Sequence, residues 1–111
     1  MYNQGDILLV PIPFTDLSSQ KRRPVFVLSK KEYNVITDDL IVAAITSNLR
    51  DRPYGITFTN NDMIVGFLKT ESCVCADKIY TLSKSIVVKR FGTVNPDVVK
   101  RVKEKIFDVM A

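Results

Sequence analysis

Two residues at the borders of apolar runs have the chemistry to act on a phosphate group. Arg23 stands directly before Pro24 at the start of one run, and Thr46 lies at the end of the next. Proline restricts the preceding residue to extended backbone, so the Arg23 side chain starts from a stiff base. Its guanidinium stays charged and can bind two phosphate oxygens at once. Thr46 has few rotamers, so its hydroxyl can be aimed at a phosphate oxygen with little loss of entropy. The pair predicts binding of a phosphodiester and stabilisation of its transition state.

Proton transfer has few candidate residues. The sequence contains no histidine, the side chain that most often moves protons near neutral pH. Asp77 interrupts an otherwise apolar run and precedes Lys78. Three interpretations of Asp77 are open: it orients Arg23, it accepts the proton of a ribose hydroxyl, or it makes a structural ion pair. Asp16 is a weaker alternative. Arg23 also has a plain interpretation as a surface cation, and Thr46 as a hydrogen-bonded strand residue.

The order of apolar runs and turns predicts the elements that hold these residues. With 111 residues, 46% of them hydrophobic, the chain is expected to form one domain over residues 1–111. Continuous and alternating apolar segments predict strands at residues 6–13, 24–29, 40–47, 54–59, 72–82 and 87–94. Asn95 as N-cap and Pro96 at the first helical position begin an amphipathic helix whose apolar stripe runs to Met110. The polar segment 14–22 predicts a long loop.

Charge, hydropathy and cysteine content narrow the functional classes. The net charge of +4 favours a polyanionic partner only mildly, but the cations gather in loops expected at one end of the sheet. No apolar run is long enough to span a bilayer and the N-terminus lacks the features of a signal peptide, so we expect a cytoplasmic protein without membrane contact. Cys73 and Cys75 would project from one face of a strand. With no histidine or further cysteine, two small apolar residues are a better interpretation than a zinc site.

With these residues in this order, the chain resembles the PemK/MazF family of toxins from toxin–antitoxin pairs. The resemblance is carried by segments 5–10, 23–25, 40–47 and 76–78, followed by the terminal helix. It implies a mainly β fold with α (α+β), a small SH3-like antiparallel β-barrel or sheet with a C-terminal helix. It also implies a homodimer, a cognate antitoxin partner, DNA binding by the toxin–antitoxin complex, and cleavage of single-stranded RNA without a metal or other cofactor.

The resemblance also assigns site residues. The arginine and threonine of the family fall on Arg23 and Thr46, and Asp77 matches an aspartate that in some relatives works with an arginine two residues earlier; here that position holds Cys75. Attack by the ribose 2′-hydroxyl would leave a 2′,3′-cyclic phosphate and a 5′-hydroxyl. Residues expected to bind RNA are Lys21, Arg22, Ser47, Arg50 and Arg52, with Phe14 or Tyr54 stacking on bases.

Two other functions are compatible with the same resemblance. The related CcdB toxins share this fold and bind DNA gyrase without catalysis, so a gyrase inhibitor is the first alternative. An RNA-binding module that has lost its nuclease activity is the second. The basic loop and Arg23-Pro24 favour the nuclease over the gyrase inhibitor.

Overall fold

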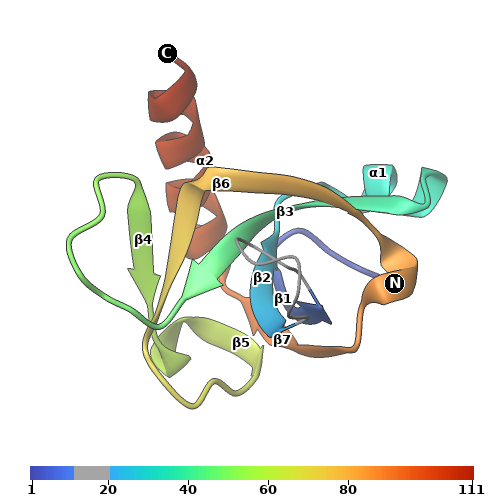
Figure 1. The fold of residues 1–111 in the computed structure, drawn as a ribbon, viewed down its shortest axis with the longest axis horizontal. Helices are drawn as coiled ribbons and strands as arrows, with labels where there is room; N and C mark the ends of the chain where they lie inside the picture. Colours follow the sequence, from blue (N-terminus) through green and yellow to red (C-terminus); the bar gives the residue numbers. More distant parts are fainter. Residues whose placement is uncertain (12–20) are drawn as a thin grey trace.

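A computed structural model describes residues 1–11 and 21–111 of the chain, in which seven strands form one antiparallel sheet of order β4-β6-β3-β2-β1-β7-β5. The strands are β1 (Asp6–Pro11), β2 (Arg22–Val27), β3 (Asp39–Thr46), β4 (Gly55–Phe58), β5 (Met63–Gly66), β6 (Ser72–Ser83) and β7 (Lys89–Val94). The helices are α1 (Lys31–Ile36) and α2 (Pro96–Met110), and short 3-10 turns lie at Asn60–Asp62 and Lys84–Ile86. The sheet curls into a half-barrel with α2 at one side (Figure 1), which confirms the predicted mainly β fold with a C-terminal helix.

A register change in the longest strand bends the sheet. Along β3 and β6, Ala44 is opposite Cys75, but the next residue, Ala43, is opposite Ile79. Residues 76–78 therefore have no partner on β3, and an insertion of this kind bends and twists the strand that carries it. Before the bend, β6 also pairs with β4 on its other side, from Ser72 to Cys75. β6 therefore belongs to both halves of the curled sheet.

Each face of the sheet buries its own apolar core, because successive strand residues point to opposite faces. Phe26 belongs to a helix-side core that includes Val98 and Val102 of α2. Its neighbours Val25 and Val27 belong to the opposite core. The helix-side core comprises Ile7, Phe26, Ala43, Ile45, Ile56, Phe58, Leu68, Val74, Ala76, Val94, Val98 and Val102. The opposite core comprises Leu8, Val10, Val25, Val27, Leu40, Val42 and Leu82.

The helix α2 begins as its sequence predicts. The side chain of Asn95 accepts a hydrogen bond from the Val98 amide at 3.0 Å, and Pro96 occupies the first turn. The helix packs across β6 and β4 (Figure 1). The apolar stripe is buried at Val98 and Val102, whereas Met110, on the last turn, is 71% exposed. Neither helix in the described part of the chain is long and apolar enough to cross a membrane.

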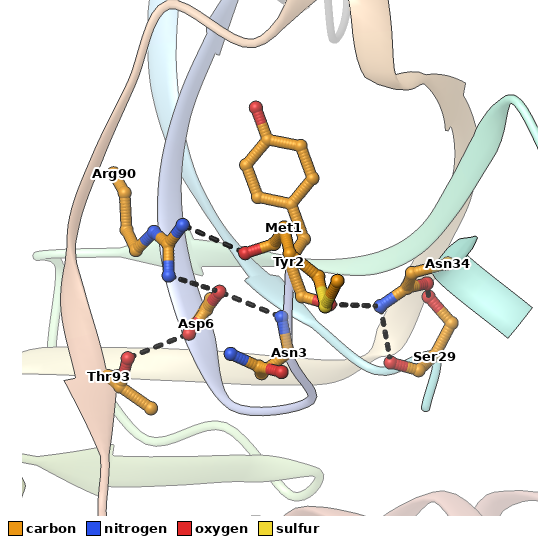
Figure 2. Close-up of polar contacts among 8 residues, drawn as sticks. All are labelled: Met1, Tyr2, Asn3, Asp6, Ser29, Asn34, Arg90 and Thr93. Carbon is orange, nitrogen blue, oxygen red and sulfur yellow. Dashed lines mark hydrogen bonds and ion pairs between the residues drawn. The ribbon is translucent and has the colours of Figure 1, made fainter. Parts of the chain in front are cut away.

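The short helix α1 and the segment before it are fixed by a buried asparagine. Asn34 is buried and its amide nitrogen donates to the backbone carbonyls of Tyr2 and Ser29, at 3.1 and 3.0 Å (Figure 2). The Ser29 hydroxyl in turn accepts a hydrogen bond from the Ile41 amide at 3.0 Å. These bonds connect the N-terminal segment, the end of β2 and β3 through one buried polar group.

A buried carboxylate joins β1 to β7. Asp6 is fully buried; its oxygens accept hydrogen bonds from the Thr93 hydroxyl at 2.7 Å and the Asn3 amide at 2.9 Å. The Arg90 guanidinium lies 3.3 Å from the same carboxylate and donates to the Met1 carbonyl at 2.9 Å (Figure 2). Buried charge is stable only when it is paired and hydrogen-bonded, and both conditions hold here.

The two cysteines are packing residues, as predicted. Cys73 and Cys75 are buried free thiols on β6. Burial is the main cause that raises the pKa of both thiols; for Cys75 the neighbouring Cys73 and Asp77 add to the rise, while Arg52 opposes it for both. The folded protein therefore favours the uncharged thiols.

The raised thiol pKa values predict that the folded protein becomes less stable at alkaline pH. The pKa of a thiol in the unfolded chain is about 8.5, and the pKa values of the two thiols in the folded protein are higher. Their contribution to the free energy of unfolding is therefore complete below about pH 8.5 and falls as the pH rises toward the folded pKa values. Urea unfolding at pH 7.5 and 10 should show this loss, and the double variant Cys73→Ala, Cys75→Ala should show a smaller one. Equal losses in the two proteins would contradict it.

Candidate nucleic-acid interface

The pairing of β2 with β3 brings Arg23 and Thr46 together. The register sets Val25 opposite Ala44, and the two pairs that follow keep the same alignment. The paired residues end at Val25 and Ala44. If the same alignment is continued by two residues along each strand, Arg23 stands opposite Thr46. Arg23 and Thr46 also line the same cavity, whose volume is about 560 Å³.

The cavity combines apolar walls with cationic and hydroxyl groups. Its described lining comprises Ile7, Arg23, Pro24, Ile45, Thr46, Ser47, Phe67, Leu68, Lys69, Thr70, Ser72, Lys89 and Phe91. Three of these residues are cations, Arg23, Lys69 and Lys89, and none of those described is acidic. Cations gathered around one hollow without carboxylates attract anions. The remaining polar lining consists of hydroxyls, which donate to and accept from oxygen atoms.

A hydrogen bond from the loop after β3 leaves the Thr46 hydroxyl able to donate a hydrogen bond to a ligand. The Asn48 amide donates to Thr46 Oγ1 at 3.1 Å, so that oxygen already serves as an acceptor and its own hydrogen is left to donate. The Asn48 side-chain oxygen accepts from the Arg50 amide at 3.2 Å. The Asn48 carbonyl accepts from Arg52 Nε at 3.4 Å. Asn48, which sequence reasoning did not select, therefore organises the segment that presents Thr46.

The predicted site residues divide between two hollows. Ser47 shares the first cavity with Arg23 and Thr46, whereas Arg50, Arg52 and Asp77 line a second hollow of about 380 Å³. Further described residues of the second hollow are Asp51, Pro53, Tyr54, Gly55, Cys75 and Lys78. The structure thus brings Arg23 and Thr46 together and places the Asp77 carboxylate in a different hollow. The catalytic role of Asp77 stays a prediction.

Other predicted contacts lie outside both hollows or outside the described residues. Lys21 and Arg22 are exposed beside Arg23, but neither lines the first cavity. Phe14 and Asp16 fall in the segment 12–20, outside the residues that the structure describes. Within the described part, no group of three or more cysteine, aspartate or glutamate side chains is placed to hold a metal ion.

Sequence reasoning missed the side of the cavity that is supplied by the segment after β5, the start of β6 and β7. The missed lining residues with polar or aromatic side chains are Phe67, Lys69, Thr70, Ser72, Lys89 and Phe91. One signal was available in the sequence, because each of two segments places an aromatic residue two positions from a lysine: Phe67 with Lys69, and Lys89 with Phe91. Aromatic and cationic residues in alternation are typical of surfaces that bind single-stranded nucleic acid.

Among curated proteins, no sequence matches this chain. Three similar solved structures share the fold. A MazE–MazF complex from Deinococcus radiodurans has 23% identity, covers 98% of this chain and 95% of that chain, and has a TM-score of 0.79. An endoribonuclease in complex with its cognate antitoxin from a mycobacterial species has 21% identity, covers 99% of this chain and 95% of that chain, and has a TM-score of 0.78. The Mycobacterium tuberculosis toxin MazF-mt6 has 20% identity, covers 95% of this chain and 95% of that chain, and has a TM-score of 0.76.

The family is shown by a sequence model rather than by these structures, whose identities establish only the fold. The model described as PemK-like, MazF-like toxin of type II toxin–antitoxin system matches residues 3–110, nearly the whole chain. The match spans all seven strands and both helices described above. This chain is therefore a member of the PemK-like, MazF-like toxins of type II toxin–antitoxin systems.

Proposed function

We propose that this toxin is an endoribonuclease that cleaves single-stranded RNA at short sequence motifs. The observation that carries the proposal is that Arg23 of β2 and Thr46 of β3 line one cavity whose described lining is cationic and free of carboxylates. A guanidinium next to a hydroxyl suits a phosphodiester, because both groups donate to its oxygens. Membership of the toxin family adds support for this activity.

The proposed reaction uses the nucleophile that RNA carries. The ribose 2′-oxygen attacks the adjacent phosphorus and gives its proton to solvent water. The bond from phosphorus to the 5′-oxygen breaks as that oxygen gains a proton. The products are a 2′,3′-cyclic phosphate and a 5′-hydroxyl, with no change of oxidation state and no metal ion in the scheme. Arg23 stabilises the extra negative charge on the phosphoryl oxygens, and Thr46 donates a hydrogen bond to one of them. Lys69 and Lys89 are the described lining residues that can deliver a proton to the 5′-oxygen.

We further propose that a cognate antitoxin neutralises the toxin in the cytoplasm and that the toxin acts as a homodimer. Support for the antitoxin comes from the family and from two of the similar structures, which are complexes of this kind. A flexible acidic antitoxin segment would compete with RNA for the cationic cavity. The homodimer rests on the family resemblance alone.

The activity is tested by incubating the purified protein with a long single-stranded RNA in the presence of EDTA. We expect discrete fragments with 5′-hydroxyl ends, because RNA supplies the nucleophile and the protein supplies positioning and charge. The matched control is an oligonucleotide of the same sequence built of 2′-deoxynucleotides, which lacks the nucleophile and should stay intact. Uncut RNA would overturn the proposal. In that event, a mobility shift without fragments would indicate an RNA-binding module, and binding to DNA gyrase would indicate an inhibitor.

A further inference from the structure

The segment after β5 is held rigidly at the edge of the cavity. Asn60 contacts the backbone of Leu68 twice: its side-chain oxygen accepts from the Leu68 amide at 2.6 Å and its amide nitrogen donates to the Leu68 carbonyl at 2.5 Å. The Leu68 side chain is buried in the helix-side core. Both the backbone and the side chain of Leu68 are therefore anchored, which constrains the backbone of the two residues beside it, Phe67 and Lys69.

Phe67 is an exposed aromatic residue on this rigid segment. It is 67% exposed and lines the cavity of Arg23 and Thr46, with the cationic Lys69 two positions away. A large apolar side chain held in water loses the free energy that its burial would give, so a fixed exposed phenylalanine beside a binding cavity points to a ligand that covers it. The three cations of the described lining indicate that this ligand is anionic.

The second aromatic residue of the cavity is already covered. Phe91 is half-buried and packs against the helix-side core. The Lys89 ammonium lies 4.9 Å from the centre of its ring, a cation–π contact on the ring face. Of the two aromatic residues in the described lining, Phe67 is thus the one with an accessible ring.

We propose that Phe67 is a stacking platform for an unpaired nucleobase next to the phosphate held by Arg23. An anionic ligand with a flat apolar surface fits a fixed ring flanked by cations, and a single-stranded nucleotide has both features. The inference rests on the proposed function, since the base belongs to the RNA that is cleaved. A base-paired duplex would not fit, because its bases are stacked on one another and have no free face.

A tryptophan reporter tests the platform directly. The sequence contains no tryptophan, so Phe67→Trp places a single indole at the site and keeps an aromatic ring there. Phe107→Trp is the matched control, because Phe107 is 71% exposed on α2 and does not line the cavity. The probe is a mixed-sequence 12-nucleotide RNA that is 2′-O-methylated throughout and so cannot be cleaved. Inorganic polyphosphate at the same phosphate concentration serves as a polyanion without bases.

We expect the RNA to quench the fluorescence of the Phe67→Trp protein but not that of the Phe107→Trp protein, and polyphosphate to quench neither. Phe67→Ala should weaken RNA binding by about 5- to 150-fold, the usual effect of losing one stacked base. Phe67→Trp, which keeps an aromatic ring, should bind RNA more tightly than Phe67→Ala. Circular dichroism of the alanine variant checks that it is folded.

Three outcomes would overturn the inference. If wild-type protein cuts RNA and the alanine variant cuts and binds it equally well, the proposed function stands and the platform does not. If Phe67→Ala changes the oligomeric mass in light scattering but leaves RNA affinity unaltered, the ring contacts protein rather than a base. If wild-type protein neither binds nor cuts RNA, the proposed function fails and the platform fails with it.

Discussion

Replacing Arg23 with alanine is expected to lower the rate constant of RNA cleavage by about 10²–10³, the usual cost of removing a preorganised donor to a developing oxyanion. The reason is the place of Arg23 near the start of β2, where it lines the same cavity as Thr46. The effect should appear in the rate constant more than in RNA affinity, because the added charge exists only in the transition state. Single-turnover cleavage with enzyme in excess measures this constant directly.

Two further variants make the Arg23 experiment specific. Arg23→Lys keeps a positive charge but loses the two-pronged geometry, so it should recover only part of the activity. Arg101→Ala removes an exposed arginine on α2, away from the cavity, and should cut at the rate of the wild-type protein. If Arg23→Ala cleaves RNA as fast as the Arg101 variant, Arg23 has no part in the reaction.

A large loss of stability is expected from Arg90→Met. Methionine keeps much of the aliphatic length of arginine but removes the cation that faces the fully buried Asp6 carboxylate at 3.3 Å. It also removes the hydrogen bond to the Met1 carbonyl and the contact with the Tyr2 ring. Leaving a buried charge without its partner is strongly destabilising, and because Arg90 is itself partly exposed we expect a loss of about 2–3 kcal/mol. Urea unfolding, with midpoint and slope fitted separately, measures it.

The Asp6–Arg90 pair can be separated from general effects of removing an arginine. Arg101→Met should change the free energy of unfolding by no more than about 0.5 kcal/mol, as is usual for an exposed position. Combining Asp6→Asn with Arg90→Met should cost less than the sum of the two single changes, because each removes the same interaction. A loss below about 1 kcal/mol for Arg90→Met would show that Thr93 and Asn3 suffice to hold the carboxylate.

The sequence carries enough information for the long elements of the fold but not for the short ones. The six predicted strands and α2 are present, with ends that differ by one or two residues where the structure describes them, because each contains a sustained apolar pattern. α1 was not predicted: its six residues are too few for a helical period, and it depends on the hydrogen bonds of Asn34 to distant backbone. β5 was not predicted either, since its four residues are mostly exposed and pair with one neighbour only.

The candidate site was predictable to a similar extent. Arg23 and Thr46 could be selected because proline and strand ends mark them locally, and the register of β2 with β3 then aligns them. The place of Asp77 in another hollow could not be foreseen, because Asp77 lies in the insertion at 76–78, which has no partner on β3 and leaves no local pattern in the sequence. Phe67 was missed for a related reason: it follows β5, whose pairing with β7 is non-local.

The neighbouring strands β3 and β6 each contribute residues to both cores. β3 contributes Ala43 and Ile45 to the helix-side core and Leu40 and Val42 to the opposite core, and β6 is shared in the same way. Neither half of the sheet can open without loosening a strand that also closes the other half. Unfolding of the sheet should therefore be all-or-none. Degradation of the sheet by a protease then depends on rare global opening rather than on fraying of one side.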